Sequence, residues 1–199
     1  MALASATFAG LLLLGAAGAS GQMIEGRDSL TERLRDGHIE VSEAGDRRAG
    51  GITGARALAI VDAPFGRVVR ALADFRSYAR IIPQLRTSRV LSQRGLDTRL
   101  FVEAELPHVD ARWAELSVNV DARDDGVHVI EATMRRGNVN ALFARWEVAP
   151  TVGRVRTLVA LELLVDPAIP LPDSMVTAAN KDAVRDAINS VRHYMRNAR

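Results

Sequence analysis

Apolar and polar residues alternate along five segments between residues 98 and 165. Alternation with a period of two is typical of a strand that places one face on the core and the other in water. Turn-forming residues separate the segments, among them Asp124, Asp125 and Gly126, and the connections are short. The pattern therefore predicts an antiparallel meander with one buried face. We expect its strands at residues 98–106, 111–122, 127–135, 140–148 and 155–165, with one more at 87–92.

The segments on either side of the meander have other patterns. Residues 55–62 form an apolar, strand-like run, after which Asp62 is suited to cap a helix and Pro64 to lie in its first turn. A second short helix is expected over residues 74–82. Residues 173–198 repeat apolar side chains at helical spacing along one stripe, which predicts a long helix with one apolar side. Since the helix and the sheet each have one apolar face, we expect an α+β fold with this helix across the concave face of the sheet.

The first 20 residues differ from the rest of the chain. They contain no charged side chain, and four consecutive leucines at residues 11–14 form an apolar centre. The small residues Ala17, Gly18 and Ala19 fit the pattern at which an export signal is cleaved. No Lys or Arg precedes the apolar run, as it would in a usual signal, so an uncleaved membrane anchor and a cytosolic protein stay open as alternatives. We expect a protein that is exported to the periplasm or the exterior, or that associates with a membrane through this segment.

Residues 21–54 are polar and rich in glycine and charge. Ser29 with Glu32 forms a capping box, which predicts a short helix that ends near Gly37. A short strand is possible at residues 38–41, and the Gly50-Gly51 pair indicates a loop or linker. We therefore divide the chain into a signal or anchor (1–20), a polar linker (21–54) and one folded domain (55–199).

Composition narrows the classes of function. The chain has 199 residues, of which 48% are hydrophobic and 25% charged, as in an ordinary globular protein. Its 26 basic and 24 acidic residues nearly cancel to a net charge of +2, and we expect no nucleic-acid partner. Cysteine is absent, which excludes disulfides, thiolate metal sites and cysteine nucleophiles.

The motifs of catalysis and of cofactor binding are missing from the sequence. The four histidines lack metal-ligand spacing, no glycine-rich phosphate loop occurs, and there is no G-x-S-x-G nucleophile elbow. We predict no catalytic residue, no metal and no cofactor, and leave open whether the protein is an enzyme. Alternation directs Arg112 and His128 inward, where a ligand carboxylate or phenolate would be a suitable partner. The alternatives are a strand-end side chain that reaches water and a bulge that reverses the alternation.

Two segments resemble a known family. Residues 59–91 read AIVDAPFGRVVRALADFRSYARIIPQLRTSRVL, and residues 168–195 read AIPLPDSMVTAANKDAVRDAINSVRHYM. They are similar to the opening and the final helix of START-like proteins of the polyketide cyclase/dehydrase and coenzyme Q-binding type. The matching residues of the opening are Asp62-Ala63-Pro64, Asp74-Phe75, Tyr78 and Pro83. The resemblance implies the helix-grip fold, in which a curved sheet surrounds a helix and an apolar cavity, and it covers residues 55–196. Phe75 and Tyr78 are assigned to the core.

In such a fold the inner face of the sheet and the apolar stripe of the final helix would line the cavity. Many of these residues are alanines, whose small side chains leave volume, and Trp146 is the best aromatic candidate for the wall. The predicted ligand-binding residues are Leu100, Val102, Ala104, Arg112, Leu116, Val118, His128, Ile130, Ala132, Met134, Leu142, Ala144, Trp146, Val159, Leu161, Val176, Ala179 and Ala183.

The resemblance leaves three hypotheses about function. The first is binding or carriage of a hydrophobic small molecule, such as a lipid, quinone or polyketide-like compound. The second is an enzyme of the aromatase/cyclase kind, in which Arg112 or His128 orients an enolate. The third is a protein-interaction module, as in the ribosome-associated members of the group.

Overall fold

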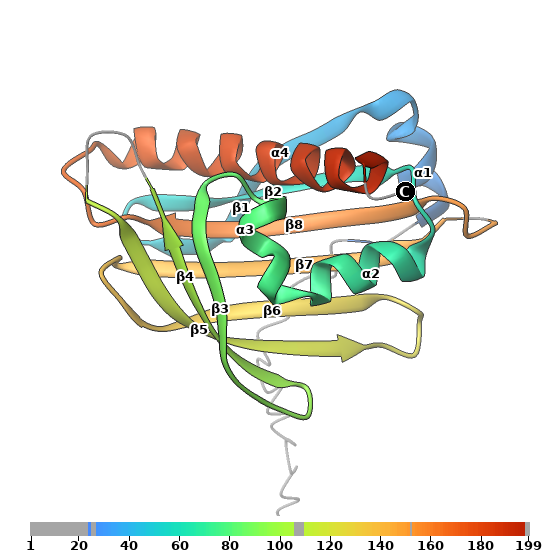
Figure 1. Cartoon of the computed structure of the whole chain (residues 1–199). Coiled ribbons are helices and arrows are strands. Elements are labelled where there is room, and N and C mark those ends of the chain that lie inside the picture. The colour runs from blue at the N-terminus through green and yellow to red at the C-terminus, as the bar shows by residue number, and fades with distance from the viewer. Residues whose placement is uncertain (1–23, 25–26, 106–109, 152, 198–199) are drawn as a thin grey trace, which may run out of the picture.

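One antiparallel sheet organises the molecule. The computed structural model describes residues 24, 27–105, 110–151 and 153–197. Eight strands pair in the order β1-β2-β8-β7-β6-β5-β4-β3, and the long helix α4 runs across the sheet (Figure 1). The strands are β1 Ile39–Ala49, β2 Ile52–Val61, β3 Leu85–Arg94, β4 Asp97–Ala104, β5 Arg112–Ala122, β6 His128–Gly137, β7 Ala141–Pro150 and β8 Thr157–Asp166. The helices are α1 Arg27–Arg33, η1 Arg35–Gly37, α2 Phe65–Ala73, η2 Phe75–Ser77, α3 Tyr78–Ile81 and α4 Asp173–Asn197.

The predicted α+β helix-grip fold is confirmed. The meander from β3 to β8 follows the alternating segments of the sequence, with the strand ends shifted by a few residues. The two short helical segments follow β2, and α4 covers the stripe that was expected to be helical. The start of α2 differs from the prediction, because Pro64 and not Asp62 is its N-cap residue. Asp62 lies two residues too early for its side chain to cap the first amides of the helix.

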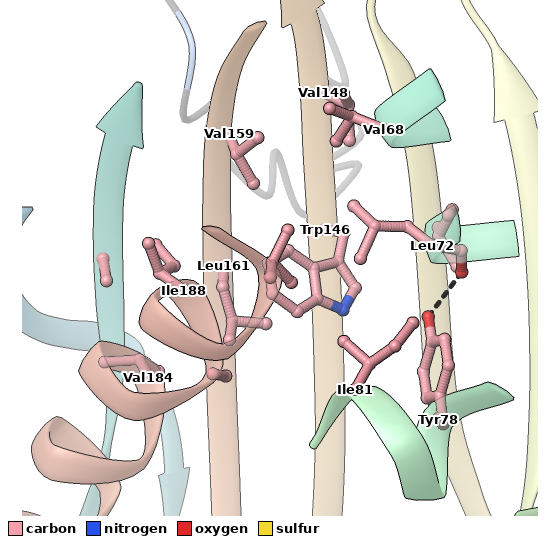
Figure 2. Close-up of a cluster of buried hydrophobic side chains, with 14 of the residues drawn as sticks. Val68, Leu72, Tyr78, Ile81, Trp146, Val148, Val159, Leu161, Val184 and Ile188 are labelled. Atoms are coloured by element: carbon pink, nitrogen blue, oxygen red, sulfur yellow. Dashed lines mark hydrogen bonds between the residues drawn. The ribbon is translucent and has the colours of Figure 1, made fainter. Parts of the chain in front are cut away.

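The main core lies on the concave side of the sheet. There α4 packs on β2 and β8, while α2 packs on β6 and β7. Trp146 lies between the two groups of helices, with Ile188 of α4 on one side and Leu72 of α2 on the other (Figure 2). The Tyr78 hydroxyl donates a hydrogen bond of 2.6 Å to the Leu72 carbonyl, which joins α3 to α2. The segments before and after the meander are therefore both needed to complete this core.

A second core lies on the convex side and corrects the expectation of one buried face. Its cluster combines outward-facing strand residues, among them Leu58 and Leu158, with Ile24, Leu30 and Leu34 from the N-terminal part of the chain. Ile24 is 1% exposed and Leu34 is fully buried. β2 shows no alternation of apolar and polar residues, because it is buried on both faces and is therefore apolar at almost every position.

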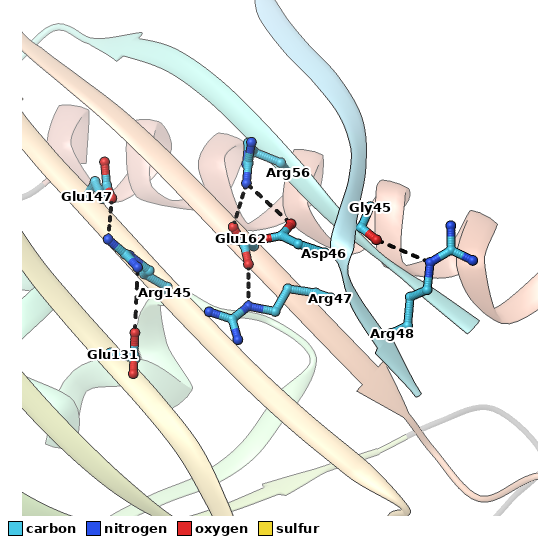
Figure 3. A network of polar contacts seen from close by, with 9 residues as sticks. All are labelled: Gly45, Asp46, Arg47, Arg48, Arg56, Glu131, Arg145, Glu147 and Glu162. Carbon is cyan, nitrogen blue, oxygen red and sulfur yellow. Dashed lines mark hydrogen bonds and ion pairs between the residues drawn. The ribbon is translucent and has the colours of Figure 1, made fainter. Parts of the chain in front are cut away.

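Buried ion pairs continue this convex surface (Figure 3). Glu162 of β8, 2% exposed, accepts hydrogen bonds from the Arg47 Nε at 2.7 Å and the Arg56 Nη2 at 2.9 Å. On the neighbouring strand β7, Arg145 donates to fully buried Glu147 at 2.7 Å. Because buried charges are costly unless they are paired, the contacts of Glu162 tie β1 and β2 to β8, whereas the Arg145–Glu147 pair lies within β7.

The domain boundary predicted at residue 55 does not separate two structural units. Residues 39–49 are the edge strand β1, and β2 begins at Ile52, within the predicted linker. Only residues 38–41 had been expected as a strand. The sequence pattern does not indicate the full length of β1, because its charged residues interrupt the apolar alternation. They face solvent or form the ion pairs of the convex side. Gly37 ends the short helical region with φ +79°, as its position suggested.

The predicted signal or anchor, residues 1–20, lies outside the described residues. Within the part of the chain that the structure describes, no helix is both long and apolar enough to cross a membrane.

Candidate ligand-binding cavity

A cavity of about 470 Å³ lies between the sheet and α4. Its floor is the inner face of β4 to β8, and α4 covers one side of it. The segment from η2 through α3 to the start of β3 forms the opposite side. This volume falls in the range of pockets that hold small organic ligands.

Small side chains account for the space. Ala132 of β6 and Ala144 of β7 are cross-strand neighbours, and both line the cavity. Ala179 and Ala183 of α4 line it from the opposite wall. Larger residues at these four positions would fill the gap between helix and sheet, as in an ordinary close-packed interior. The alanine pattern of the sequence therefore has a structural counterpart at this place.

Most of the residues predicted to bind a ligand come together in the lining. That they contact a ligand is still a prediction. Those that line the cavity are Leu100, Val102, Ala104, Arg112, Leu116, Val118, Ile130, Ala132, Leu142, Ala144, Trp146, Leu161, Val176, Ala179 and Ala183.

Three predicted residues lie elsewhere. The His128 ring packs edge-to-face on Phe65 at the start of α2, with 5.2 Å between ring centroids. Val159 is fully buried in the main core, and Met134 packs against the same core. All three have the inward alternation, but Phe65 of α2 packs on His128, Val159 is enclosed by the main core, and Met134 adjoins the bulge that shifts the β5–β6 register. Direction toward the concave side is therefore not enough to place a residue on the cavity wall.

Other lining residues were missed by the sequence analysis. Phe75 and Tyr78 had been assigned to the core, and they belong to both the core and the lining. Trp113 contributes to the lining although its alternation points outward, and its ring stacks on Phe101 at 6.0 Å. Inward alternation or helical spacing could have identified part of the rest. The remaining residues are Ile82, Gln84, Leu85, Ala114, Val139, Leu163, Val165, Pro167, Asn180, Asp182, Asp186 and Ala187.

The polar side chains deep in the lining have partners within the protein. The amide of Asn180, 3% exposed, accepts from the Val165 N–H at 3.0 Å and donates to the Val165 carbonyl at 3.2 Å. The Tyr78 hydroxyl is bonded to the Leu72 carbonyl, and burial raises its pKa well above the usual range. Tyr78 is therefore a neutral hydrogen-bond donor and not a base at physiological pH.

Charged side chains are confined to the rim. Asp182 and Asp186 of α4 are exposed, and Asp182 pairs with Arg185 at 2.7 Å. Arg112 is half-buried at the start of β5, and its guanidinium donates to the carbonyls of Pro167 at 2.8 Å and Asp110 at 3.2 Å. Its inward direction is as predicted, but the side chain is held by the loop before α4 and does not extend freely into water.

Within the described residues, no group of three histidine or acidic side chains is placed to hold a metal ion. Among the described lining residues, the apolar interior also brings no pair of acid and base side chains together. The arrangement can thus enclose an apolar molecule, with charged contacts available only at its edge.

Comparison with known proteins agrees with this geometry. A START superfamily protein from Mycobacterium smegmatis superposes with a TM-score of 0.63 at 16% identity, covering 82% of this chain and 100% of the other. A STAR-related lipid transfer protein from Xanthomonas axonopodis gives 0.65 at 14% identity, with 79% and 93% covered. The Zhui aromatase/cyclase from Streptomyces sp. R1128 gives 0.51 at 16% identity, with 81% and 97% covered. At these identities the superpositions establish the fold alone.

A search of curated proteins found no match in sequence. The family model described as polyketide cyclase/dehydrase and lipid transport matches residues 61–192, which is more than half of the chain. This segment runs from the end of β2 to the last turns of α4 and so contains all the described lining residues of the cavity. The chain therefore belongs to the polyketide cyclase/dehydrase and lipid transport family, with the START-like helix-grip fold.

Proposed function

We propose that this protein binds or carries a hydrophobic small molecule in the cavity between sheet and α4. The observation that carries the proposal is the cavity itself, about 470 Å³ with a mainly apolar lining. Burial of an apolar ligand there would release ordered water and stabilise the complex in proportion to the area covered. The family description and the lipid transfer protein from Xanthomonas axonopodis support the same class of ligand.

A cyclase activity is the second candidate, because an aromatase/cyclase is among the similar structures. Of the two residues suggested for that chemistry, His128 packs on Phe65 and is not part of the lining. Arg112 is at the rim, and Tyr78 is held as a neutral donor. Enolate chemistry needs a general base within reach of the substrate. The carboxylates of the described lining, Asp182 and Asp186, are on the exposed rim and not in the apolar interior, so this lining favours carriage over catalysis.

We further propose that the protein acts outside the cytoplasm or at a membrane surface. The support is the apolar leader of residues 1–20, with its small residues at the expected cleavage position. Fractionation of the native host and sequencing of the mature N-terminus test this. A cytoplasmic protein that keeps residue 1 would overturn the location and would reopen the protein-interaction alternative.

Native mass spectrometry of the protein purified from its own host tests the binding function. We expect the wild-type protein to retain an apolar ligand. The Ala132→Phe variant should lose it, because the phenylalanine side chain enters the cavity. Thr133→Phe is the matched control, because the neighbouring residue of a strand points to the opposite face and Thr133 is exposed. Absence of any retained ligand, together with no stabilisation by lipids, quinones or polyketides, would refute the proposal.

A further inference from the structure

Arg112 stands out among the residues of the cavity wall. Among the lining residues that the structure describes, it is the one basic side chain. It is half-buried beside the apolar lining, and no carboxylate of a described residue lies within ion-pair distance of it. A guanidinium in such surroundings is stabilised by an anionic partner, because partial burial removes water that would otherwise solvate the charge.

Contacts with the protein hold this guanidinium in place without neutralising it. Its Nε donates to the Pro167 carbonyl at 2.8 Å and its Nη1 to the Asp110 carbonyl at 3.2 Å. Both acceptors are neutral backbone groups. A guanidinium has five N–H donors, so donors on the two terminal nitrogens are still available for a two-pronged bond to a carboxylate.

From this we infer that Arg112 is the anchor for the acidic end of the ligand, and that the cavity takes an amphiphile with an apolar body and a single carboxylate. The inference rests on the proposed function and specifies its substrate class. The deeper wall, formed by residues such as Leu116, Ala132 and Trp146, receives the apolar body.

The other charges on the rim support a singly charged head. Asp182 and Asp186 also border the cavity, and Asp182 is paired with Arg185. Their negative charge disfavours a phosphate monoester, which carries a charge of about −1.5 to −2 near neutral pH. A carboxylate carries one negative charge and has the planar shape that the guanidinium fork matches.

Displacement of the neutral fluorophore N-phenyl-1-naphthylamine tests the assignment. The competitors are tetradecanoic acid, tetradecan-1-ol and tetradecylamine, used below their aggregation limits at about pH 8, where carboxylates are ionised. We expect the acid to bind at least about tenfold more tightly than the alcohol, as a charge-assisted hydrogen bond provides. Arg112→Gln should remove this preference, while Arg112→Lys should retain part of it.

Because Arg112 also holds the loop before α4, the decisive measurement is the ratio of acid to alcohol affinity. Loosening of the loop would lower the affinity for both ligands together, whereas loss of the anchor lowers the affinity for the acid alone. Arg123→Gln is the matched control, since Arg123 follows the other end of β5 and the variant loses the same charge. It should keep the preference for the acid.

Three results would overturn the inference. Equal affinity of the wild-type protein for acid and alcohol would reject the anchor while leaving the proposed function intact. Tighter binding of the amine than of the acid would mean that the rim aspartates, and not Arg112, recognise the head group of the ligand. If the fluorophore and all three competitors fail to bind, the anchor is rejected, and the proposed function falls with it when no lipid, quinone or polyketide stabilises the protein either.

Discussion

Ala144→Leu tests whether the space above β7 is a true cavity. Ala144 lines it beside its cross-strand neighbour Ala132. The leucine adds three carbon groups, and burial of each is worth about 0.8 kcal/mol, so about 2 kcal/mol is available. Ordering the longer side chain costs about 0.5–1 kcal/mol. We therefore expect the ligand-free variant to be about 1–2 kcal/mol more stable than wild type.

Urea denaturation and thermal melting measure this effect. In urea the midpoint should rise with an unchanged slope, which identifies a change of stability and not of compactness. For a domain of this size, 1 kcal/mol corresponds to about 2–4 °C, so the melting temperature should rise by about 2–8 °C. Ligand affinity should fall in the same variant, because the leucine occupies part of the binding volume.

Ala59→Leu provides the matched control. Ala59 also faces the concave side, but it is fully buried in the main core and absent from the cavity wall. Overpacking there should destabilise the protein by about 1–3 kcal/mol. If Ala144→Leu lowered stability as much as Ala59→Leu does, the region above Ala144 would be close-packed and the reasoning from the cavity would fail.

Three further changes test individual contacts in the same denaturation assay. Asn180→Leu should cost about 1–3 kcal/mol, because the Val165 amide loses its acceptor, and an unchanged midpoint would contradict this role. Trp146→Ala should cost about 3–5 kcal/mol, since it removes a buried ring between two groups of helices, and a loss below 1 kcal/mol would show that the ring is poorly packed. Glu115→Gln should destabilise at neutral pH, because hydrogen bonding to Arg136 holds the pKa of Glu115 below its ordinary value. That contribution is present above the unfolded-state pKa and is lost as the pH falls through the folded-state pKa, so a difference from wild type that does not shrink as the pH is lowered into the acid range would refute it.

Part of the candidate site could be predicted because strand alternation is a local property. Leu100, Val102 and Ala104 recur at every second position, which directs them to the same side of β4 wherever that strand lies. The helical spacing of Val176, Ala179 and Ala183 similarly directs them to one side of α4. Resemblance to START-like proteins then indicated that these two faces meet around a cavity.

The N-terminal part shows where local patterns fail. β1 was predicted as four residues within a linker, whereas it is an eleven-residue strand. Its charged residues resemble those of a loop until the long-range pair between Arg47 and Glu162 is known. Ile24 and Leu34 are too few apolar residues to indicate a core from the sequence. They form a core only together with the apolar residues on the convex face of the sheet.

Periodicity along the chain is enough to assign the strands, the long helix and the side of the sheet toward which each residue points, because these depend on neighbours within a few positions. It does not reveal how far the helices stand from the sheet. His128 and Ala132 lie four residues apart on the same strand and show why that distance matters. Phe65 packs on His128, whereas Ala132 is on the cavity wall. The distance between the helices and the sheet depends on side chains from distant segments. The environment of Arg112 does too, because the carbonyl that it contacts belongs to Pro167, 55 residues away. Only the tertiary arrangement brings such groups together, which is why it alone locates the cavity and the one basic group in its described lining.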